Sequence, residues 1–347
     1  MKITWLSSRY LGGDLSSTTQ IQLANGLVAK GHTVDFYSPG KSVGNDFTHH
    51  PIQRSQMRGF QASSVMKELK KRVSEFKKAD VVLIDWPIFK LAPLIDVPVI
   101  LMDRSPPADR GIFAKLQWPM WTKAWSKAIR GTVVSDAHRI FVAEKTQTPK
   151  ASIGVIPAGV DLDLFQSGVK GGTIRMVYHG RVDVNRGVMS LPMILAGLQS
   201  NGIDASLHIH GSGDAVKRLQ NIGMPGLEIT DSIPQDEIAQ LLSKCDVGFL
   251  PMPENKVWNL ASPLKRSEYL ASGLVICGID HPGHRIKDSE DWIQLFSQKE
   301  FISRSVSWIS SLDRQLLTSL QKESRAHAEQ HLSWTHSVDA LESMILS

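Results

Sequence analysis

Short apolar stretches alternate along the first half of the chain with segments whose apolar residues recur at helical spacing. Lys2–Leu6 and Thr33–Tyr37 are predicted strands, and Thr18–Lys30 between them is a predicted helix that Gly31 ends. Val65–Lys78 has an apolar face and a lysine-rich face, which is typical of an amphipathic helix. Further strands are expected at Val81–Ile84, Val97–Met102, Val133–Val134 and Ile140–Val142, with a helix start near Ser135.

The same alternation of strands and helices begins again at Ile174. Strands are predicted at Met176–His179, Ser206–Ile209, Leu227–Ile229, Val247–Leu250 and Leu274–Cys277. Helices are predicted at Gly187–Ser200, Gln235–Ser243, about Pro263–Ser272 and within Leu316–Ser347. Ile153–Phe165, which contains a proline and a glycine, is interpreted as a linker. The pattern therefore predicts two α/β domains, each with a mostly parallel, doubly wound sheet, and 347 residues suffice for both.

Composition restricts the class of protein. With 42% hydrophobic and 21% charged residues the chain is globular and not disordered. Cys245 and Cys277 lie in apolar stretches, which argues against a disulfide framework or a zinc site and suits a reducing compartment. The N-terminus lacks the apolar core of a signal peptide, and three charged residues interrupt the most apolar region, Val81–Met102. We therefore expect a cytoplasmic protein.

Positive charge is concentrated in the first half of the chain. Residues 1–165 hold 22 Lys and Arg against 14 Asp and Glu, whereas the remainder holds 17 against 20. Within this half, 110–131 combines basic residues with Trp118, Trp121 and Trp125, which share one helical face. This face could contact the inner surface of a membrane as a peripheral protein does, or the tryptophans could pack on their own domain.

The segment Asn259–Gly278 is the most informative for chemistry. Ser262 is a suitable N-cap, Pro263 suits the first helical position, and Gly273 ends the helix. A helix N-terminus at the carboxyl edge of a sheet offers N–H groups and a positive dipole end to a phosphate. Glu268 lies one turn into this helix, where it is either an ordinary solvated carboxylate or a group that binds a sugar diol.

Other loops after strands carry residues suited to the same ligand. Arg181 and Arg186 follow a predicted strand and could hold a diphosphate and stabilise it as a leaving group. The first predicted strand leads to Gly12 and Gly13, where a ligand could approach the backbone. Gly211 and Gly213 follow another strand, in a loop that would influence the choice of base. Asp161 and Asp163 could be taken for a metal-binding pair, but a turn that caps the next segment is favoured.

The chain resembles the retaining GT-B glycosyltransferases of family 4. The segments that carry the resemblance span nearly the whole sequence, and SPLKRSEYLASGL is the most specific. The others are weaker individually but occur in the family's order: LANGLVAKGHTV, VIPAGVDLDLF, YHGRVDVNRGV, IHGSGD and IPQDEIAQLLSKCDVGFLPM. The resemblance implies two Rossmann-like domains facing a cleft, with an acceptor-binding domain at 1–165 and a donor-binding domain at 166–330. It also implies that a last helix at 331–347 crosses back to the first domain.

The resemblance assigns roles to these residues. Glu268 would bind the ribose of a nucleotide-sugar, Arg181 and Arg186 its diphosphate, and Gly13 would approach the phosphate or sugar. Ser262, Pro263 and Leu264 would contribute backbone N–H groups or shape at the helix start. The implied donor-binding set is Gly12, Gly13, Arg181, Arg186, Gly211, Gly213, Ser262, Pro263, Leu264 and Glu268. Such enzymes need no catalytic metal, so we expect no cofactor.

The sequence departs from the family pattern at two places. Leu260 stands where the family has the first glutamate of a pair, so the usual contact to the donor sugar is missing or supplied differently. Where the family often has a histidine near the reacting centre, this chain has Asp103 and Arg104. These two residues could orient the donor sugar or the acceptor, or they could form a structural ion pair. The candidate catalytic residues are therefore Asp103, Arg104, Arg181 and Arg186.

Sequence and resemblance together predict a retaining glycosyltransferase that uses a UDP- or GDP-sugar. The expected acceptor is a glycan, a lipid-linked sugar or another hydroxyl compound, and the basic first half leaves an RNA acceptor open. Front-face retention is expected, with the leaving diphosphate helping to remove the acceptor proton. Two alternatives stay open: a nucleotide-sugar epimerase of the same architecture, and a non-catalytic protein that binds nucleotide-sugars.

Overall fold

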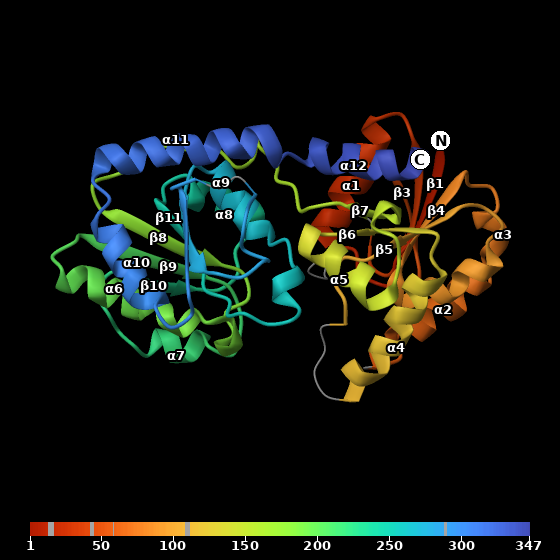
Figure 1. Cartoon of the computed structure of the whole chain (residues 1–347), viewed down its shortest axis with the longest axis horizontal. Coiled ribbons are helices and arrows are strands. Elements are labelled where there is room, and N and C mark those ends of the chain that lie inside the picture. Colours follow the sequence, from red (N-terminus) through yellow and green to blue (C-terminus); the bar gives the residue numbers. More distant parts are fainter. Residues whose placement is uncertain (13–16, 42–44, 58, 108–111, 288–289) are drawn as a thin grey trace. The chain divides into compact units, whose positions relative to one another are not determined.

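The structure, a computed structural model, describes residues 1–12, 17–41, 45–57, 59–107, 112–287 and 290–347. The chain forms two compact units (Figure 1). Unit 1 comprises Met1–Ala158 together with Trp334–Ser347, and unit 2 comprises Gly159–Ser333. The division falls a few residues before the expected boundary at 165, because Phe165 belongs to the core of unit 2 and the N–H of Val160 donates to the carbonyl of Leu332 in the same unit.

Unit 1 is built on a parallel sheet in which seven strands are described, in the order β3-β2-β1-β4-β5-β6-β7. The strands are β1 (Lys2–Leu6), β2 (Thr33–Ser38), β3 (Thr48–Pro51), β4 (Val81–Asp85), β5 (Val99–Met102), β6 (Arg130–Val133) and β7 (Ile153–Val155). The start of the predicted linker is therefore the edge strand β7, which pairs with β6. The strand order reverses between β1 and β4, which is where ligands bind in open α/β sheets.

Helices cover both faces of this sheet (Figure 1). Helix α1 (Ser17–Ala29) and helix α12 (Trp334–Leu346) pack on the face that presents Trp5 and Phe36. The other face is covered by α2 (Gln61–Lys70), α3 (Val73–Phe76), the 3-10 helix η1 (Trp86–Leu94), α4 (Ile112–Lys127) and α5 (Asp136–Thr146). A short 3-10 helix, η2 (Lys150–Ser152), precedes β7. Alternate strand residues point to opposite faces, so each strand contributes to two cores.

One predicted strand of unit 1 is wrong. Ile140–Val142 lies inside helix α5, whose N-cap is Ser135, and the hydroxyl of Ser135 accepts from the N–H of His138. The short apolar run was misread because a helix of this length places its few apolar residues next to one another in sequence as readily as a strand does. The helix start expected near Ser135 is confirmed.

Unit 2 has a second parallel sheet, in which six strands are described in the order β10-β9-β8-β11-β12-β13. The strands are β8 (Ile174–His179), β9 (Ala205–His210), β10 (Leu227–Thr230), β11 (Val247–Leu250), β12 (Val275–Ile279) and β13 (Ile293–Phe296). The order reverses between β8 and β11, next to the helix of the SPLK segment.

The helices of unit 2 are α6 (Leu191–Ser200), α7 (Val216–Gln220), α8 (Gln235–Leu242), α9 (Leu264–Ala271), α10 (Phe301–Ser310) and α11 (Arg314–His331). Three 3-10 turns lie in its loops: η3 (Val184–Arg186), η4 (Val188–Ser190) and η5 (Trp258–Leu260). The buried residues of the sheet and helices form one core.

Helix α12 returns to unit 1 and packs on α1. Val338, Leu341 and Ile345 are buried in the core of that face. At the edge of this core, Glu342 forms an ion pair with Nζ of Lys30 at 2.7 Å, and its other carboxylate oxygen lies 2.8 Å from Nε2 of His32. The last helix therefore belongs to the first unit, although it starts at Trp334 and not at 331. Among the described helices, none combines the length and the apolarity that crossing a bilayer requires.

Candidate functional site

The candidate site lies within unit 2, where the carboxyl end of β8 meets the first turns of α9. Glu268, on α9, is only 7% exposed. Its Oε2 lies 3.2 Å from Nε2 of His179, the last residue of β8, although the pair lacks hydrogen-bond geometry. Nε2 of Gln235, at the start of α8, donates to Oε1 of Glu268 at 3.4 Å. Glu268 is thus held by neighbours and is not the solvated carboxylate of the plainer interpretation.

Lys265 is a buried cation beside this carboxylate. Its Nζ lies 3.9 Å from the centroid of the Tyr178 ring and has no hydrogen-bond partner among the described residues. Burial, together with the charge of Arg186, lowers the pKa of Lys265 to about 7, and the charge of Glu268 opposes this shift. A buried ammonium without a hydrogen-bond acceptor is costly, and an anion placed next to it would remove that cost.

Arg181 and Arg186 lie in the loop after β8 and share one carboxylate. Arg181 donates to Asp183 through Nε at 3.2 Å and Nη2 at 3.0 Å. Nε of Arg186 lies 3.8 Å from Oδ2 of Asp183, and its guanidinium lies over the ring of Trp258 at 5.9 Å. Arg181 is half exposed, whereas Arg186 is more buried and acts electrostatically on Lys265. The structure therefore groups Arg186 with Lys265 and Glu268 and ties Arg181 to Asp183.

Helix α9 begins one residue later than predicted. Its N-cap is Pro263, not Ser262, and no side chain caps it. Proline takes the cap position because its extended conformation, with φ of −72° and ψ of 124°, suits a residue that precedes a helix. The N–H groups of Leu264 and Lys265 have no acceptor within the helix, so the helix N-terminus stays suited to an anion.

Gly211 and Gly213 lie against the loop that follows β8. A side chain on Gly211 would collide with the carbonyl oxygen of Gly180, and one on Gly213 would collide with that of Val182. Gly211 also has a φ of +150°. The missing side chains let one loop pack on the other, which positions the Arg181 loop; a direct contact of these glycines with a donor stays a prediction.

Leu260, at the position of the family's first glutamate, ends the 3-10 turn η5 and is buried at 7% exposure. The same turn places Trp258 near Arg186. The turn itself contains no Asp or Glu that could take the place of the missing glutamate. Glu254, which precedes the turn, accepts a hydrogen bond from the side chain of Asn259.

Asp103, in unit 1, is buried in an aromatic cluster. Its Oδ2 accepts from Nε1 of Trp121 at 2.6 Å and from Nε1 of Trp125 at 2.8 Å, and Nε2 of His138 lies 3.4 Å away. Because Asp103 is 0% exposed, these contacts favour a structural role over orientation of a substrate. The structural partner is a pair of indoles and not the expected Arg104.

Arg104 follows Asp103 and donates through Nη1 to the carbonyl of Ile156 at 3.0 Å. Burial lowers the pKa of Arg104 to about 10, with a contribution from the positive charge of Arg9. Gly12 has a φ of +80°, and its N–H donates to the hydroxyl of Ser17. Gly13 lies outside the described residues.

The tryptophans of 110–131 pack on their own domain. Trp121 and Trp125, both on α4, are fully buried, and the ring of Trp118 packs edge-on against that of Trp121. The interpretation that these rings insert into a membrane surface is therefore wrong for Trp121 and Trp125, whose indole N–H groups bind Asp103. The exposed side of α4 instead carries Lys115, Lys123 and Lys127 beside Leu116.

Among the described residues, no cluster of three His, Cys, Asp or Glu side chains could hold a metal ion. Asp161 accepts through Oδ1 from the N–H groups of Asp163 and Leu164, which confirms that it caps a turn.

Two members of the site were missed from the sequence. Lys265 lies in the SPLK segment, three residues before Glu268, and a lysine one turn before a buried acid on the same helix would have indicated it. His179 is the last residue of a strand at the carboxyl edge, which is where ligand-binding residues gather.

Comparison with known proteins shows what this chain resembles. A model described as Glycosyltransferase Family 4 matches residues 16–164. No curated protein matches the chain significantly.

Solved structures with the same fold cover nearly the whole chain. The sucrose-phosphate synthase of Thermosynechococcus elongatus is 15% identical, with 99% of this chain and 98% of that chain covered and a TM-score of 0.80. WaaG, a glycosyltransferase involved in lipopolysaccharide biosynthesis, is 14% identical, with 99% of both chains covered and a TM-score of 0.74. Anabaena HepE in complex with UDP and glucose is 13% identical, with full coverage of both chains and a TM-score of 0.74.

Proposed function

We propose that this chain, which has the GT-B fold, is a family 4 glycosyltransferase that transfers a sugar from a UDP- or GDP-sugar to a hydroxyl acceptor with retention of configuration. One observation carries the choice of donor. Within unit 2 a buried ammonium, a partly buried guanidinium and a buried carboxylate converge at a sheet edge beside an uncapped helix N-terminus. The cations suit a diphosphate and the carboxylate suits a diol, and a nucleotide-sugar carries both.

In the proposed complex, Lys265 and Arg186 hold the diphosphate together with the N–H groups of Leu264 and Lys265. Glu268 accepts hydrogen bonds from the ribose hydroxyls, and His179 keeps its carboxylate in place. Arg181 contributes once a phosphate competes with Asp183 for its guanidinium. A helix N-terminus and two cations stabilise negative charge as it develops on the leaving group.

The proposed reaction needs no enzyme nucleophile. The bond from the anomeric carbon to the leaving phosphate oxygen breaks while the acceptor oxygen bonds to that carbon on the same face. The proton of the acceptor hydroxyl passes to the leaving phosphate oxygen, so charge and atoms balance. The diphosphate acts as the base because it gains negative charge as the bond breaks, and the cations of unit 2 stabilise that charge.

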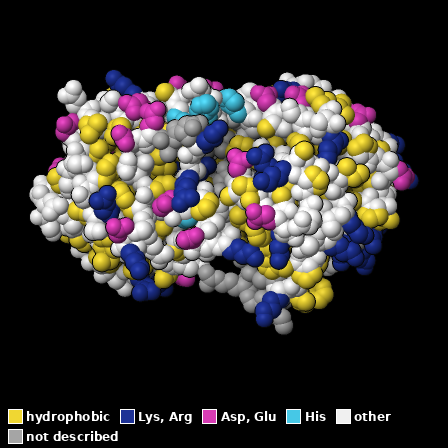
Figure 2. Space-filling view, in the orientation of Figure 1, with side chains coloured by type: hydrophobic (Ala, Val, Ile, Leu, Met, Phe, Trp, Pro, Cys, Tyr) yellow, Lys and Arg dark blue, Asp and Glu magenta, His cyan; other side chains and the backbone are white. Residues whose placement is uncertain are grey.

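The proposed acceptor is a glycan, a lipid-linked sugar or another hydroxyl compound bound by unit 1. On the face of unit 1 shown in Figure 2, Lys and Arg side chains gather over α2 and α3, and others lie beside apolar side chains at α4. We propose a peripheral contact of 110–131 with an anionic membrane at the cytoplasmic side, carried by the lysines and Leu116 and not by the buried tryptophans. Liposome and RNA binding compared across salt would separate a membrane contact from an RNA acceptor.

Thermal shift with a panel of nucleotide-sugars tests the donor, because a ligand that binds only the folded state raises the melting temperature. Transfer from the best donor is then followed by NMR of the anomeric proton, and an axial donor should give an axial product. An inverted product would overturn retention. A new sugar nucleotide formed from the donor alone would indicate the epimerase, and binding without turnover over a broad acceptor panel would indicate a non-catalytic binder.

A further inference from the structure

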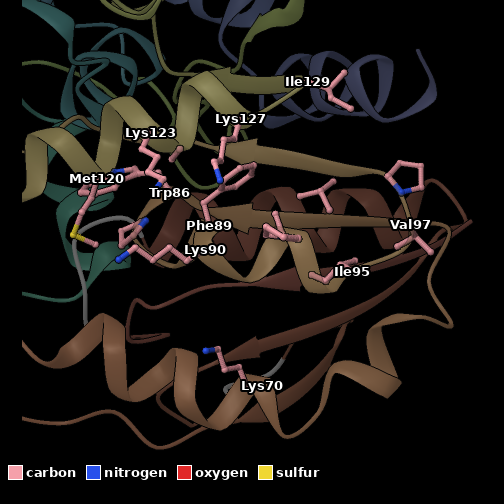
Figure 3. Close-up of a pocket in the computed structure, with 16 residues that line it drawn as sticks. Lys70, Trp86, Phe89, Lys90, Ile95, Val97, Met120, Lys123, Lys127 and Ile129 are labelled. Carbon is pink, nitrogen blue, oxygen red and sulfur yellow. The ribbon is translucent and has the colours of Figure 1, made fainter.

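Unit 1 contains a groove of about 810 Å³ between η1, α4 and the start of β5 (Figure 3). We call it the η1–α4 groove. Its apolar wall includes Trp86, Phe89, Ile95, Val97, Met120 and Ile129. A cavity of this volume with mostly apolar walls is typical of sites for small molecules. The residues of the candidate donor site do not line it, since they belong to unit 2.

Among the described residues, four lysines and no carboxylate border the groove. Lys70, Lys90, Lys123 and Lys127 are all exposed lining residues. Among the residues that the structure describes, no Asp or Glu forms an ion pair with any of the four. Asp96, which follows Ile95, is paired with Lys77 instead. The groove therefore has an uncompensated positive potential that favours an anionic ligand.

One end of the groove combines lysines with apolar side chains, and the other end is mainly apolar. Figure 3 shows Lys90 and Lys123 near Trp86 and Met120, whereas Ile95, Val97 and Ile129 lie toward the other end. Ile129 is 83% exposed and adds apolar surface at this end. A small anion without an apolar part would leave the apolar end exposed to water, and an uncharged apolar molecule would leave the charge of the lysines uncompensated. A ligand with an anionic head and a hydrocarbon chain satisfies both ends.

We propose that the η1–α4 groove binds one hydrocarbon chain of an amphiphile that carries a phosphate headgroup. The phosphate lies among Lys90, Lys123 and Lys127, and the chain extends toward Ile95, Val97 and Ile129. This site is separate from the proposed sugar transfer, because a lipid can bind here whether or not it accepts a sugar. Its test measures binding alone, without a donor, so its failure leaves the proposed function untouched.

Calorimetric titration with monoalkyl phosphates below their micelle concentration tests the proposal. Decyl phosphate is expected to bind one to one. Octyl phosphate should bind roughly 15-fold more weakly, because each of the two methylenes moved out of water contributes about fourfold in affinity. Decyl maltoside, which has the same chain without the charge, should bind more weakly than decyl phosphate, and inorganic phosphate should not compete at the same concentration.

Variants separate the two ends of the groove. Lys90→Glu and Lys123→Glu should weaken both alkyl phosphates by a similar factor and keep the ratio between decyl and octyl phosphate. Ala92→Trp, which fills the apolar wall, should reduce that ratio toward one. Ile129→Glu is a surface change that folding tolerates, and it should also reduce the ratio. Lys150→Glu makes the same charge change in unit 1 outside the groove and should leave binding unchanged.

Several outcomes would overturn the proposal. Equal affinities for decyl and octyl phosphate would show that no chain is bound. A loss in Lys150→Glu equal to that in Lys123→Glu would indicate unspecific attraction to a basic domain. Sedimentation with phosphatidylglycerol vesicles that persists in both Ala92→Trp and Ile129→Glu, without binding of decyl phosphate, would indicate a flat membrane contact that does not use the groove.

Discussion

Nζ of Lys265 lies 3.9 Å from the centroid of the Tyr178 ring and has no hydrogen-bond acceptor in the part of the chain that the structure describes, although the residue is only 9% exposed. Burial raises the pKa of Tyr178 to about 12, so the ring stays neutral and offers only its face to the cation. An anion placed next to Nζ would supply the missing acceptor and favour the charged form of the lysine. This pair therefore connects the buried lysine to the proposed diphosphate.

We predict that binding of a nucleoside diphosphate takes up a proton at Lys265. At pH 8 the Lys265 amine of the ligand-free protein, with a pKa of about 7, is mostly unprotonated, and a bound diphosphate raises that pKa by its negative charge. Calorimetry with UDP or GDP in two buffers of different ionisation enthalpy should show uptake approaching one proton. Lys265→Met should abolish the dependence on buffer, whereas Lys217→Met, on α7, should not. Equal heats in both buffers for the wild type would contradict the assignment.

The same shift predicts how stability depends on pH without ligand. The pKa of Lys265 is lowered in the folded state, while in the unfolded chain a lysine holds its proton up to about 10.4. Between these values the unfolded state binds more protons, so the free energy of unfolding rises with pH from about 7 toward 10. Below pH 7 both states are charged and this contribution is flat. Urea unfolding at pH 6, 7 and 9 should show the rise in the wild type relative to Lys265→Met; parallel curves would contradict it.

Glu268→Gln should weaken donor binding by roughly 10- to 100-fold, because it removes the charge from an acceptor that the proposed ribose hydroxyls use. The amide keeps the size of the side chain, so the melting temperature should change little. The exposed Glu237→Gln on α8 is the matched control and should bind the donor as the wild type does. Normal donor affinity in Glu268→Gln would remove Glu268 from the proposed site.

Asp103→Ala should lower the free energy of unfolding of unit 1 by about 3 kcal/mol, because it leaves two buried indole N–H groups without an acceptor. Asp96→Ala removes an exposed carboxylate of the same unit and should cost less than about 0.5 kcal/mol. Asp103→Asn keeps an acceptor oxygen and should retain both stability and turnover. A stable Asp103→Asn variant without turnover would restore the catalytic interpretation.

Gly26→Ala should destabilise unit 1, although alanine is the better helix former. A Cβ at Gly26 in α1 would collide with the side chain of Val338 in α12, and overpacking of this kind costs about 1–3 kcal/mol. Val338→Ala in the same chain should recover part of the loss, because it removes the colliding methyl groups. Gly172→Ala, where the added Cβ meets nothing, is the control in thermal unfolding. Additive losses in the double variant would show that α12 does not press on Gly26.

Periodicity in the sequence was sufficient for most of the fold. The apolar strands of both halves, the amphipathic helices and the glycine after α9 follow from local spacing, because a strand buried on both faces and a helix with one buried stripe leave different patterns. Short runs such as Ile140–Val142 failed, because three apolar residues fit a strand and one turn of a helix equally well. The predicted linker starts too early in the sequence, at β7, because a strand of three residues is too short to show a recognisable pattern.

The residues of the candidate site were also only partly predictable from the sequence. Arg186 and Glu268 were recognised in the sequence because each lies in a loop or helix with a recognisable motif. That Lys265 is a buried cation over Tyr178, that His179 adjoins Glu268, and that Asp103 binds two indoles depend on residues distant in sequence.

The sequence by itself determined two α/β units and a helix whose start is suited to a phosphate, since hydrophobic period and capping chemistry act over a few neighbours. Only the tertiary structure decided which charges are desolvated and which tryptophans are buried. Desolvation depends on everything packed around a group, and no local pattern records it.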